Sequence, residues 1–131
     1  MSFKLEREKT KTTPYILIDE EKGYMCFEGE CYFEDINGFF KEINDWLKQY
    51  MTSEFDEFVF DCKLEYFNSS TNKQIYNILR LMDAYAPGKK MVVNWIVADD
   101  DDYMLIECGE DYHDDMNNLE FNIIMKNKGH F

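Results

Sequence analysis

The sequence predicts an α/β fold in which one mixed β-sheet carries helices packed against it. Short apolar runs alternate along the chain with longer segments in which apolar residues recur every three or four positions. Strands that alternate with helices are typical of sheets with parallel pairs and right-handed crossovers. The 131 residues are 45% apolar and 17% aromatic, which suits a single domain around one core.

The first half of the chain predicts a β-hairpin and then a helix. Residues 1–13 are charged and rich in threonine, which indicates a loose or edge segment. The apolar runs at 15–18 and 24–27 are separated by a polar turn, so we expect an antiparallel pair that ends at Gly29. Residues 36–50 keep the 3.6-residue period of a buried helix face. The apolar positions of this helix are Ile36, Phe39, Phe40, Ile43, Trp46, Leu47 and Tyr50.

The second half predicts three more strands and two more helices. An apolar strand is expected at 58–64, a helix from about 70 to 85, and a strand at 91–97 that helices cover on one face or both. A helix starting near Asp101 and a last strand at 119–125 complete the order β-β-α-β-α-β-α-β. The buried face of the helix near Asp101 is expected to consist of Met104, Leu105 and Cys108. No linker or repeat divides residues 1–131, so we expect one domain with its core at about 10–125.

The charge balance excludes several classes of partner. The chain has 27 acidic and 14 basic residues and a net charge of −13. Nucleic acids and anionic membranes attract basic surfaces, so we expect neither to bind, whereas a basic protein partner is compatible with this charge. No apolar run is long enough to span a membrane, and the N-terminal residues lack the apolar core of a signal peptide. We therefore expect a cytoplasmic protein with reduced thiols.

Motifs for metal binding and catalysis are poorly developed in this sequence. The four cysteines are scattered, and Cys26 and Cys62 lie in apolar strands, where buried thiols are expected. The acidic run at 99–102 lacks the spacing of a calcium loop and is expected to cap a helix or to lie in solvent. We expect no enzyme, cofactor or metal. An alternative is a small metal-dependent hydrolase that uses Asp100 and Asp102 of this run.

Polar residues that favour a helix start are concentrated where the 58–64 strand gives way to the next helix. Asn68, Ser69, Ser70 and Thr71 are consecutive there, and Thr71 with Gln74 fits the spacing of a capping box. The first turn of a helix has free N–H groups and the positive end of the helix dipole, so it favours a phosphate on a nearby hydroxyl. Two interpretations follow: the hydroxyls only cap the helix, or one of them accepts a phosphate.

These residues belong to a set that resembles the SiaC family of bacterial regulatory phosphoproteins. The resemblance covers about residues 10–125 and is carried by Thr12-Thr13-Pro14, Phe39-Phe40, Trp46-Leu47, Tyr50, Leu64-Glu65-Tyr66-Phe67-Asn68-Ser69-Ser70, Val92-Val93-Asn94-Trp95, Asp99 to Asp102, and Gly109-Glu110-Asp111. Where the family usually has Asn-Thr-Ser-Ser, this chain has Asn-Ser-Ser-Thr from Asn68 onward, so the family's acceptor position matches Ser69. Ser70 and Thr71 remain alternative acceptors.

The resemblance implies a STAS-like fold, similar to that of anti-sigma-factor antagonists, and a partner switch. A Ser/Thr kinase would phosphorylate the turn and a PP2C-type phosphatase would remove the phosphate. The unphosphorylated protein would bind and activate a diguanylate cyclase, which makes cyclic di-GMP and thereby regulates biofilm formation. The expected partner surface is Tyr66, Phe67, Asn68, Ser70 and Thr71. The alternative to this switch is a constitutive interaction module that uses Tyr66 and Phe67 as exposed aromatics.

Overall fold

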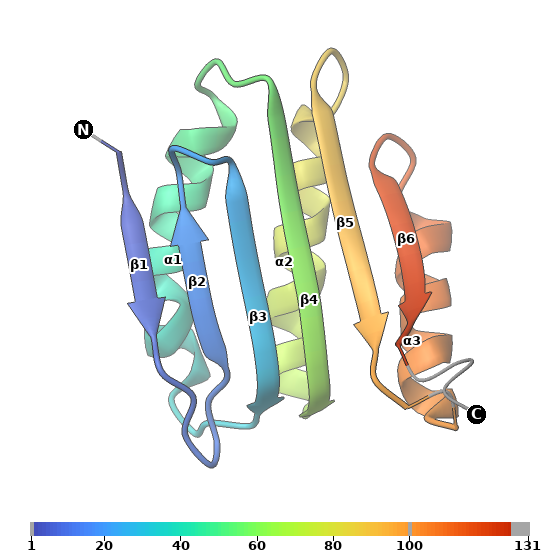
Figure 1. The fold of residues 1–131 in the computed structure, drawn as a ribbon. Helices are drawn as coiled ribbons and strands as arrows, with labels where there is room; N and C mark the ends of the chain where they lie inside the picture. Colours follow the sequence, from blue (N-terminus) through green and yellow to red (C-terminus); the bar gives the residue numbers. More distant parts are fainter. Residues whose placement is uncertain (1, 100, 127–131) are drawn as a thin grey trace.

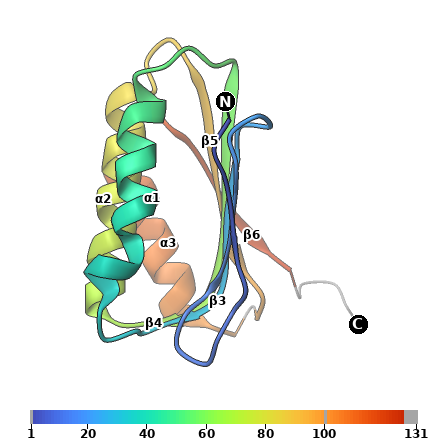
Figure 2. The ribbon, with the colours of Figure 1, turned by 90° about the vertical axis from the view of Figure 1, so that its left-hand side faces the viewer.

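The chain forms one six-stranded sheet whose strands alternate buried and exposed side chains. The structure is a computed structural model, and it describes residues 2–99 and 101–126. The strands follow one another across the sheet in sequence order (Figure 1). They are β1 (Lys4–Arg7), β2 (Tyr15–Asp19), β3 (Tyr24–Cys31), β4 (Glu57–Phe67), β5 (Lys90–Val97) and β6 (Glu120–Met125). The helices α1 (Ile36–Met51), α2 (Ser69–Tyr85) and α3 (Tyr103–Asp115) all lie on one face of the sheet (Figure 2).

The sheet is mixed, as the sequence predicts. β1, β2 and β3 pair antiparallel, whereas β3–β4, β4–β5 and β5–β6 are parallel pairs. Each parallel pair is joined by one of the three helices, because parallel neighbours need a long crossover. The prediction of an α/β fold with helices packed on a mixed sheet is confirmed.

Three parts of the strand pattern differ from the prediction by more than one residue. The segment at 1–13 contains the edge strand β1, so the order is β-β-β-α-β-α-β-α-β. β3 does not end at Gly29 but continues to Cys31, because Gly29 adopts a φ of 116° that is open to glycine. β4 continues past residue 64 to Phe67. Pairing with a neighbouring strand thus adds β1 and lengthens β3 and β4, whose own apolar patterns are short.

A bulge at the end of β4 decides which way its last side chains face. The register moves from Gly29 opposite Leu64 to Glu30 opposite Tyr66, which leaves Glu65 as an extra residue. Before the bulge the even-numbered residues of β4 face the helices, as buried Leu64 does. After it the parity changes, so Phe67 faces the helices and packs against Trp95.

The core lies between the sheet and the helix layer and is rich in aromatic side chains. Phe27 of β3 packs against Phe60 of β4 at a ring-centroid distance of 4.8 Å and against Phe40 of α1 at 5.6 Å. All three side chains are fully buried. The predicted periodic face of the first helix is confirmed at six buried positions: Ile36, Phe40, Ile43, Trp46, Leu47 and Tyr50. Phe39 is only half-buried, and the buried Met51 extends the face.

The face of the sheet opposite the helices carries a row of polar side chains. The Tyr24 hydroxyl donates to Asp61 over 2.7 Å, and the Asn94 amide donates to the other Asp61 oxygen over 2.8 Å. Asn122 donates in turn to the Asn94 side-chain oxygen over 3.1 Å. Helices therefore cover β5 on one face only. Cys62 is buried as predicted, but Cys26 is only half-buried, because it lies on this uncovered face beside Tyr24.

None of the helices in the described ranges, 2–99 and 101–126, is both long enough and apolar enough to cross a lipid bilayer.

Candidate functional site: a hydroxyl-bearing turn and its pocket

The turn between β4 and α2 is closed by an asparagine cap. Asn68 is extended, with φ −92° and ψ −179°, and its side-chain oxygen accepts a hydrogen bond from the Thr71 backbone N–H over 3.0 Å. The helix therefore begins at Ser69. The predicted capping box of Thr71 and Gln74 is wrong, because the Gln74 side chain instead bonds to Asn37 and Asn44 of α1.

The three hydroxyls of the turn lie in different surroundings. Ser69 and Ser70 are exposed. Thr71 is fully buried, and its hydroxyl donates to the Cys31 carbonyl oxygen over 2.9 Å and lies 3.3 Å from the Cys31 thiol. In this fold only Ser69 and Ser70 are accessible to a modifying enzyme, and the Thr71 side chain cannot reach a partner's surface.

The two aromatics before the turn also separate. Tyr66 is 55% exposed and rests edge-on against Tyr32 at a ring-centroid distance of 5.5 Å. Phe67 is half-buried and stands perpendicular to Trp95, 6.0 Å between ring centroids. The expectation that both aromatics are exposed is wrong for Phe67, because the bulge in β4 turns it toward the helix layer.

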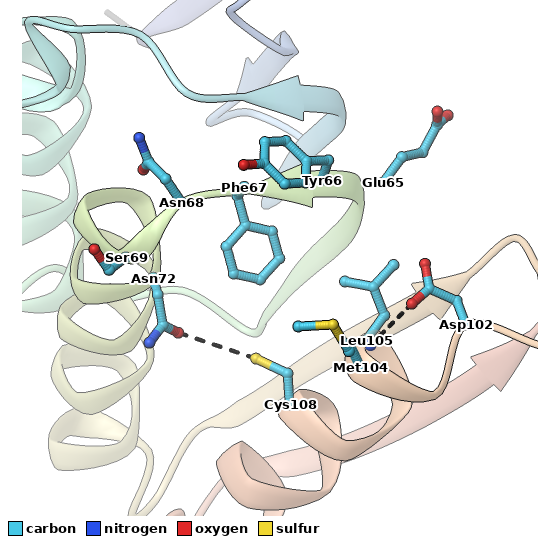
Figure 3. A pocket seen from close by; sticks show the side chains of 10 residues that line it. All are labelled: Glu65, Tyr66, Phe67, Asn68, Ser69, Asn72, Asp102, Met104, Leu105 and Cys108. Carbon is cyan, nitrogen blue, oxygen red and sulfur yellow. Dashed lines mark hydrogen bonds between the residues drawn. The ribbon is translucent and has the colours of Figure 1, made fainter.

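A pocket of about 360 Å³ opens between this turn and the start of α3 (Figure 3). The apolar walls of the pocket are formed by Phe67, Met104, Leu105 and Cys108. Ser69 borders the pocket from the α2 side. The full lining is Glu65, Tyr66, Phe67, Asn68, Ser69, Asn72, Asp102, Met104, Leu105 and Cys108. The structure thus brings four of the predicted site residues, Tyr66, Phe67, Asn68 and Ser69, to one pocket; Ser70 and Thr71 are not part of its lining.

Contacts between α3 and β5 fix the far wall of the pocket. The Trp95 indole N–H donates to the Leu105 carbonyl oxygen over 2.9 Å. Gly109 packs directly on the same indole, where an added Cβ would lie 2.4 Å from a ring carbon. The buried positions of α3 are therefore Leu105, Gly109 and Tyr112. Met104, predicted to be buried, is 86% exposed, because the helix turns its glycine toward the sheet.

Asn72, which lines the pocket, contacts two polar groups of α3. The Tyr112 hydroxyl donates to the Asn72 side-chain oxygen, and the Cys108 thiol lies 4.0 Å from the same oxygen. Burial raises the pKa of the Cys108 thiol and that of the Tyr112 phenol above their ordinary values, so both stay protonated at neutral pH. The wall of the pocket near Asn72 is therefore apolar or neutral, whereas the carboxylates of Glu65 and Asp102 line other parts of the pocket.

The acidic run before α3 includes the cap of that helix. Asp102 accepts a hydrogen bond from the Leu105 backbone N–H over 3.2 Å, and Asp99 accepts one from the Asp101 N–H over 2.9 Å. Asp100, a suggested ligand of the hydrolase alternative, lies outside the described residues. Across residues 2–99 and 101–126, no group of three or more His, Cys, Asp or Glu side chains is arranged to hold a metal ion.

Sequence reasoning missed the α3 side of the site. The apolar pattern predicts that Met104 and Cys108 are buried, and it gives Asn72 no role at the turn. A signal was present in the helix period, since Leu105, Gly109 and Tyr112 follow the spacing of one face if the glycine is counted as a contact position. When the face through Leu105, Gly109 and Tyr112 packs on the sheet, Met104 and Cys108 lie on the side of α3 that faces α2.

Comparisons found a match to one protein family and a relative of similar sequence. The model of the SiaC family of regulatory phosphoproteins matches residues 7–126. An uncharacterized protein of Pseudomonas aeruginosa (strain UCBPP-PA14) is 28% identical over 87 residues, which are 66% of this chain and 69% of that protein.

Solved structures match over nearly the whole chain. The crystal structure of apo-SiaC from Pseudomonas aeruginosa has a TM-score of 0.83 at 24% identity and covers 93% of this chain and 98% of its own. SiaC in complex with the diguanylate cyclase SiaD, whose activator it is, has a TM-score of 0.85 at 24% identity, with coverages of 92% and 98%. At this identity the structures establish the shared fold. The family match spans most of the sequence, and the chain therefore belongs to the SiaC family of regulatory phosphoproteins.

Proposed function

We propose that this protein is a non-enzymatic switch in which reversible phosphorylation of Ser69 controls binding to a signalling partner. One observation carries the proposal: the exposed residue Ser69 begins α2 and also lines the pocket between α2 and α3. A modification at this position can therefore change a binding surface without unfolding the domain.

The start of α2 suits a phosphate. A phosphoserine adds about −1.5 to −2 charge, and the first turn of a helix carries free N–H groups and roughly +0.5 charge. Asn68 accepts a bond from the Thr71 N–H, and the N–H groups of Ser69 and Ser70 lie ahead of the first intrahelical bonds. Exposed Lys73 follows Ser69 by four residues, so both lie on one helix face and a phosphate on Ser69 would be near a cation.

Ser69 is favoured over Ser70 because only Ser69 lines the pocket. A phosphate on Ser70 would gain the same helix dipole without altering the pocket. The buried Thr71 hydroxyl would have to leave the Cys31 carbonyl before it could react. We assign the switch to Ser69 and partner contact to Tyr66, Phe67 and Asn68, which line the same pocket. Thr71 holds the turn, and Ser70, which is not part of the lining, is left out of the contact surface.

By family, the partner is a diguanylate cyclase, and the enzymes that set the switch are a Ser/Thr kinase and a PP2C-type phosphatase. Support for the cyclase comes from the relative of the same fold that is bound to SiaD. The unphosphorylated form would bind and activate the cyclase. Phosphate at the pocket would weaken this complex, since an apolar contact there would have to strip water from a charged group.

Phosphopeptide mapping tests the assignment. The protein is purified from its native bacterium, one half is treated with a PP2C-type phosphatase, and both halves are analysed by mass spectrometry. We expect phosphate on Ser69 that the phosphatase removes. Phosphate confined to residues outside 69–71 would refute the assignment.

Binding assays separate the switch from a constitutive interaction module. Ser69→Ala is expected to retain binding to the cyclase, whereas Ser69→Asp, which adds one charge, is expected to weaken it. Ser70→Asp serves as the matched control on the neighbouring exposed hydroxyl. Equal binding by all three variants would favour a constitutive module, to which exposed Tyr66 would contribute.

A further inference from the structure

A groove runs along α3 on both sides of Met104. The pocket beside Ser69 lies on one side, and a second hollow of about 240 Å³ lies on the other. The second hollow is lined by Tyr103, Met104, Glu107, Cys108 and Asp111, so the two hollows share Met104 and Cys108. We refer to both hollows together as the α3 groove.

The α3 groove is apolar inside and acidic at its rim. Phe67, Leu105 and Cys108 contribute apolar surface to the hollows. Met104 is 86% exposed and Tyr103 73% exposed, unusual values for large apolar side chains. Four carboxylates border the hollows, two beside each: Glu65, Asp102, Glu107 and Asp111.

We propose that the α3 groove binds a segment of a partner protein in which an apolar side chain is flanked by lysine or arginine. The flexible, exposed Met104 can adapt to an apolar side chain placed on either side of it. The acidic rim selects basic neighbours and speeds their approach. This inference names the chemistry of the partner in the proposed function and rests on that function for the role of Ser69.

The same geometry explains how phosphate would release such a segment although the segment is basic. Ser69 borders the hollow that receives the apolar side chain. A dianion there would have to give up water when the apolar group enters, and that cost falls on the contact that supplies most of the affinity. Attraction between the phosphate and the basic flanks acts in solvent, where it is screened by salt.

Selection from a random peptide library displayed on phage, against the purified unphosphorylated protein, tests the proposal. We expect enriched peptides to combine an apolar residue with lysine or arginine within a few positions. Synthetic versions should bind more weakly as salt is raised, in fluorescence anisotropy. Enrichment of acidic peptides, or of none, would overturn the proposal. Binding of the apolar dye anilinonaphthalene sulfonate with no enriched peptide would overturn it in favour of a small-molecule site.

Two double variants of α3 locate the binding surface. Glu107→Lys with Asp111→Lys reverses the rim and should weaken the selected peptides about tenfold. Glu110→Lys with Asp114→Lys makes the same change in net charge at exposed positions outside the groove, and should leave binding within about twofold. Equal weakening by both would contradict the proposal. Because all these proteins are unphosphorylated, the result stands or falls separately from the assignment of Ser69.

Discussion

At the scale of single residues, three neighbouring hydroxyl side chains lie in three different environments, because successive residues of a helix point about 100° apart. Ser69 lines the pocket, Ser70 is exposed outside that lining, and Thr71 is buried in the core. The assignment of a regulatory role therefore depends on helix phase more than on residue type. One hydroxyl can be modified beside a binding surface while another, two positions away, holds the turn in place.

Replacing Thr71 with valine tests the structural role of its hydroxyl. Thr71→Val keeps the shape of the side chain but removes the bond to the Cys31 carbonyl, so the free energy of unfolding should fall by about 1 kcal/mol. Ser70→Ala, the exposed control, should change it by less than about 0.5 kcal/mol. Urea unfolding measures both. If Thr71→Val were as stable as the unmodified protein, the buried hydrogen bond would not contribute as we argue.

The sequence contains enough information to separate these hydroxyls, although residue type alone does not. Thr71 precedes Ile75 and Ile78 by four and seven positions, which places it on the same buried face. The turn and a helix start near residue 70 are predicted from capping chemistry, whereas Ser69 is singled out only by the resemblance to the SiaC family. The pocket is not predictable in this way, since its far wall comes from α3, more than thirty residues later in the chain.

At the scale of elements, the position of α3 depends on one indole and one glycine. Trp95 of β5 bonds to the Leu105 carbonyl oxygen, and Gly109 lets the helix backbone rest on the same ring. Tyr112 packs edge-on against Trp95 at a ring-centroid distance of 5.2 Å. These contacts place Met104 and Cys108 opposite the start of α2, so they determine the width of the pocket.

A methyl group at Gly109 should therefore disturb both stability and the pocket. Alanine favours helix by about 1 kcal/mol, but its Cβ would lie 2.4 Å from the buried Trp95 ring. We expect the clash to prevail, with Gly109→Ala lowering the free energy of unfolding by about 1–3 kcal/mol and altering tryptophan fluorescence. Glu110→Ala, at the exposed neighbouring position, is the control. A stabilised Gly109→Ala protein would show that α3 can move away from β5 at little cost.

In the first turn of α3, apolar spacing does not predict which side chains are buried. Apolar spacing assigns Met104, Leu105 and Cys108 to one buried face, yet only Leu105 is buried. A glycine carries no hydrophobic signal, so the true face through Gly109 is invisible to a count of apolar residues. Met104 is thus the clearest case of an apolar residue that is predicted to be buried but is exposed, and it lies in a candidate binding surface.

At the scale of the whole molecule, burial of weak acids couples stability to alkaline pH. Burial raises the pKa of the Tyr24 and Tyr112 phenols above their ordinary 10.0 and that of the Cys62 thiol well above 9.0. Above about pH 9 the unfolded chain loses protons that the folded chain keeps, so the free energy of unfolding falls as pH rises. At pH values below these ordinary pKa values, the groups are protonated in both the folded and the unfolded chain. They then do not lower the free energy of unfolding.

Urea unfolding at several pH values between 7 and 11 checks this coupling. Stability should be unaffected by these groups at pH 7 to 8 and should decline from about pH 9 upward. Tyr112→Phe removes one of the buried phenols, so its decline should be less steep, even though it also loses the bond to Asn72 and starts from a lower value. A decline of the same steepness in both proteins would mean that Tyr112 ionises in the folded state as readily as in the unfolded one.

The architecture is largely predictable because period-2 and period-3.6 apolar patterns reflect burial directly. At β1 the sequence predicts no more than a loose or edge segment, since four residues give too little alternation to define a strand without a partner. The extension of β4 to Phe67 depends on a bulge against β3, and no local pattern shows which residue is left unpaired. Long-range pairing, and not propensity, therefore orients the aromatic side chains of the site.

The measurement that tests the switch most directly compares site-specifically phosphorylated proteins. Phosphoserine is incorporated genetically at position 69 or, as a control, at position 70, and binding to the diguanylate cyclase is measured by calorimetry beside the unmodified protein. We predict that phosphate on Ser69 weakens binding at least about tenfold, whereas phosphate on Ser70 has a much smaller effect. Unchanged affinity with phosphate on Ser69 would contradict the claim that this hydroxyl controls the partner surface.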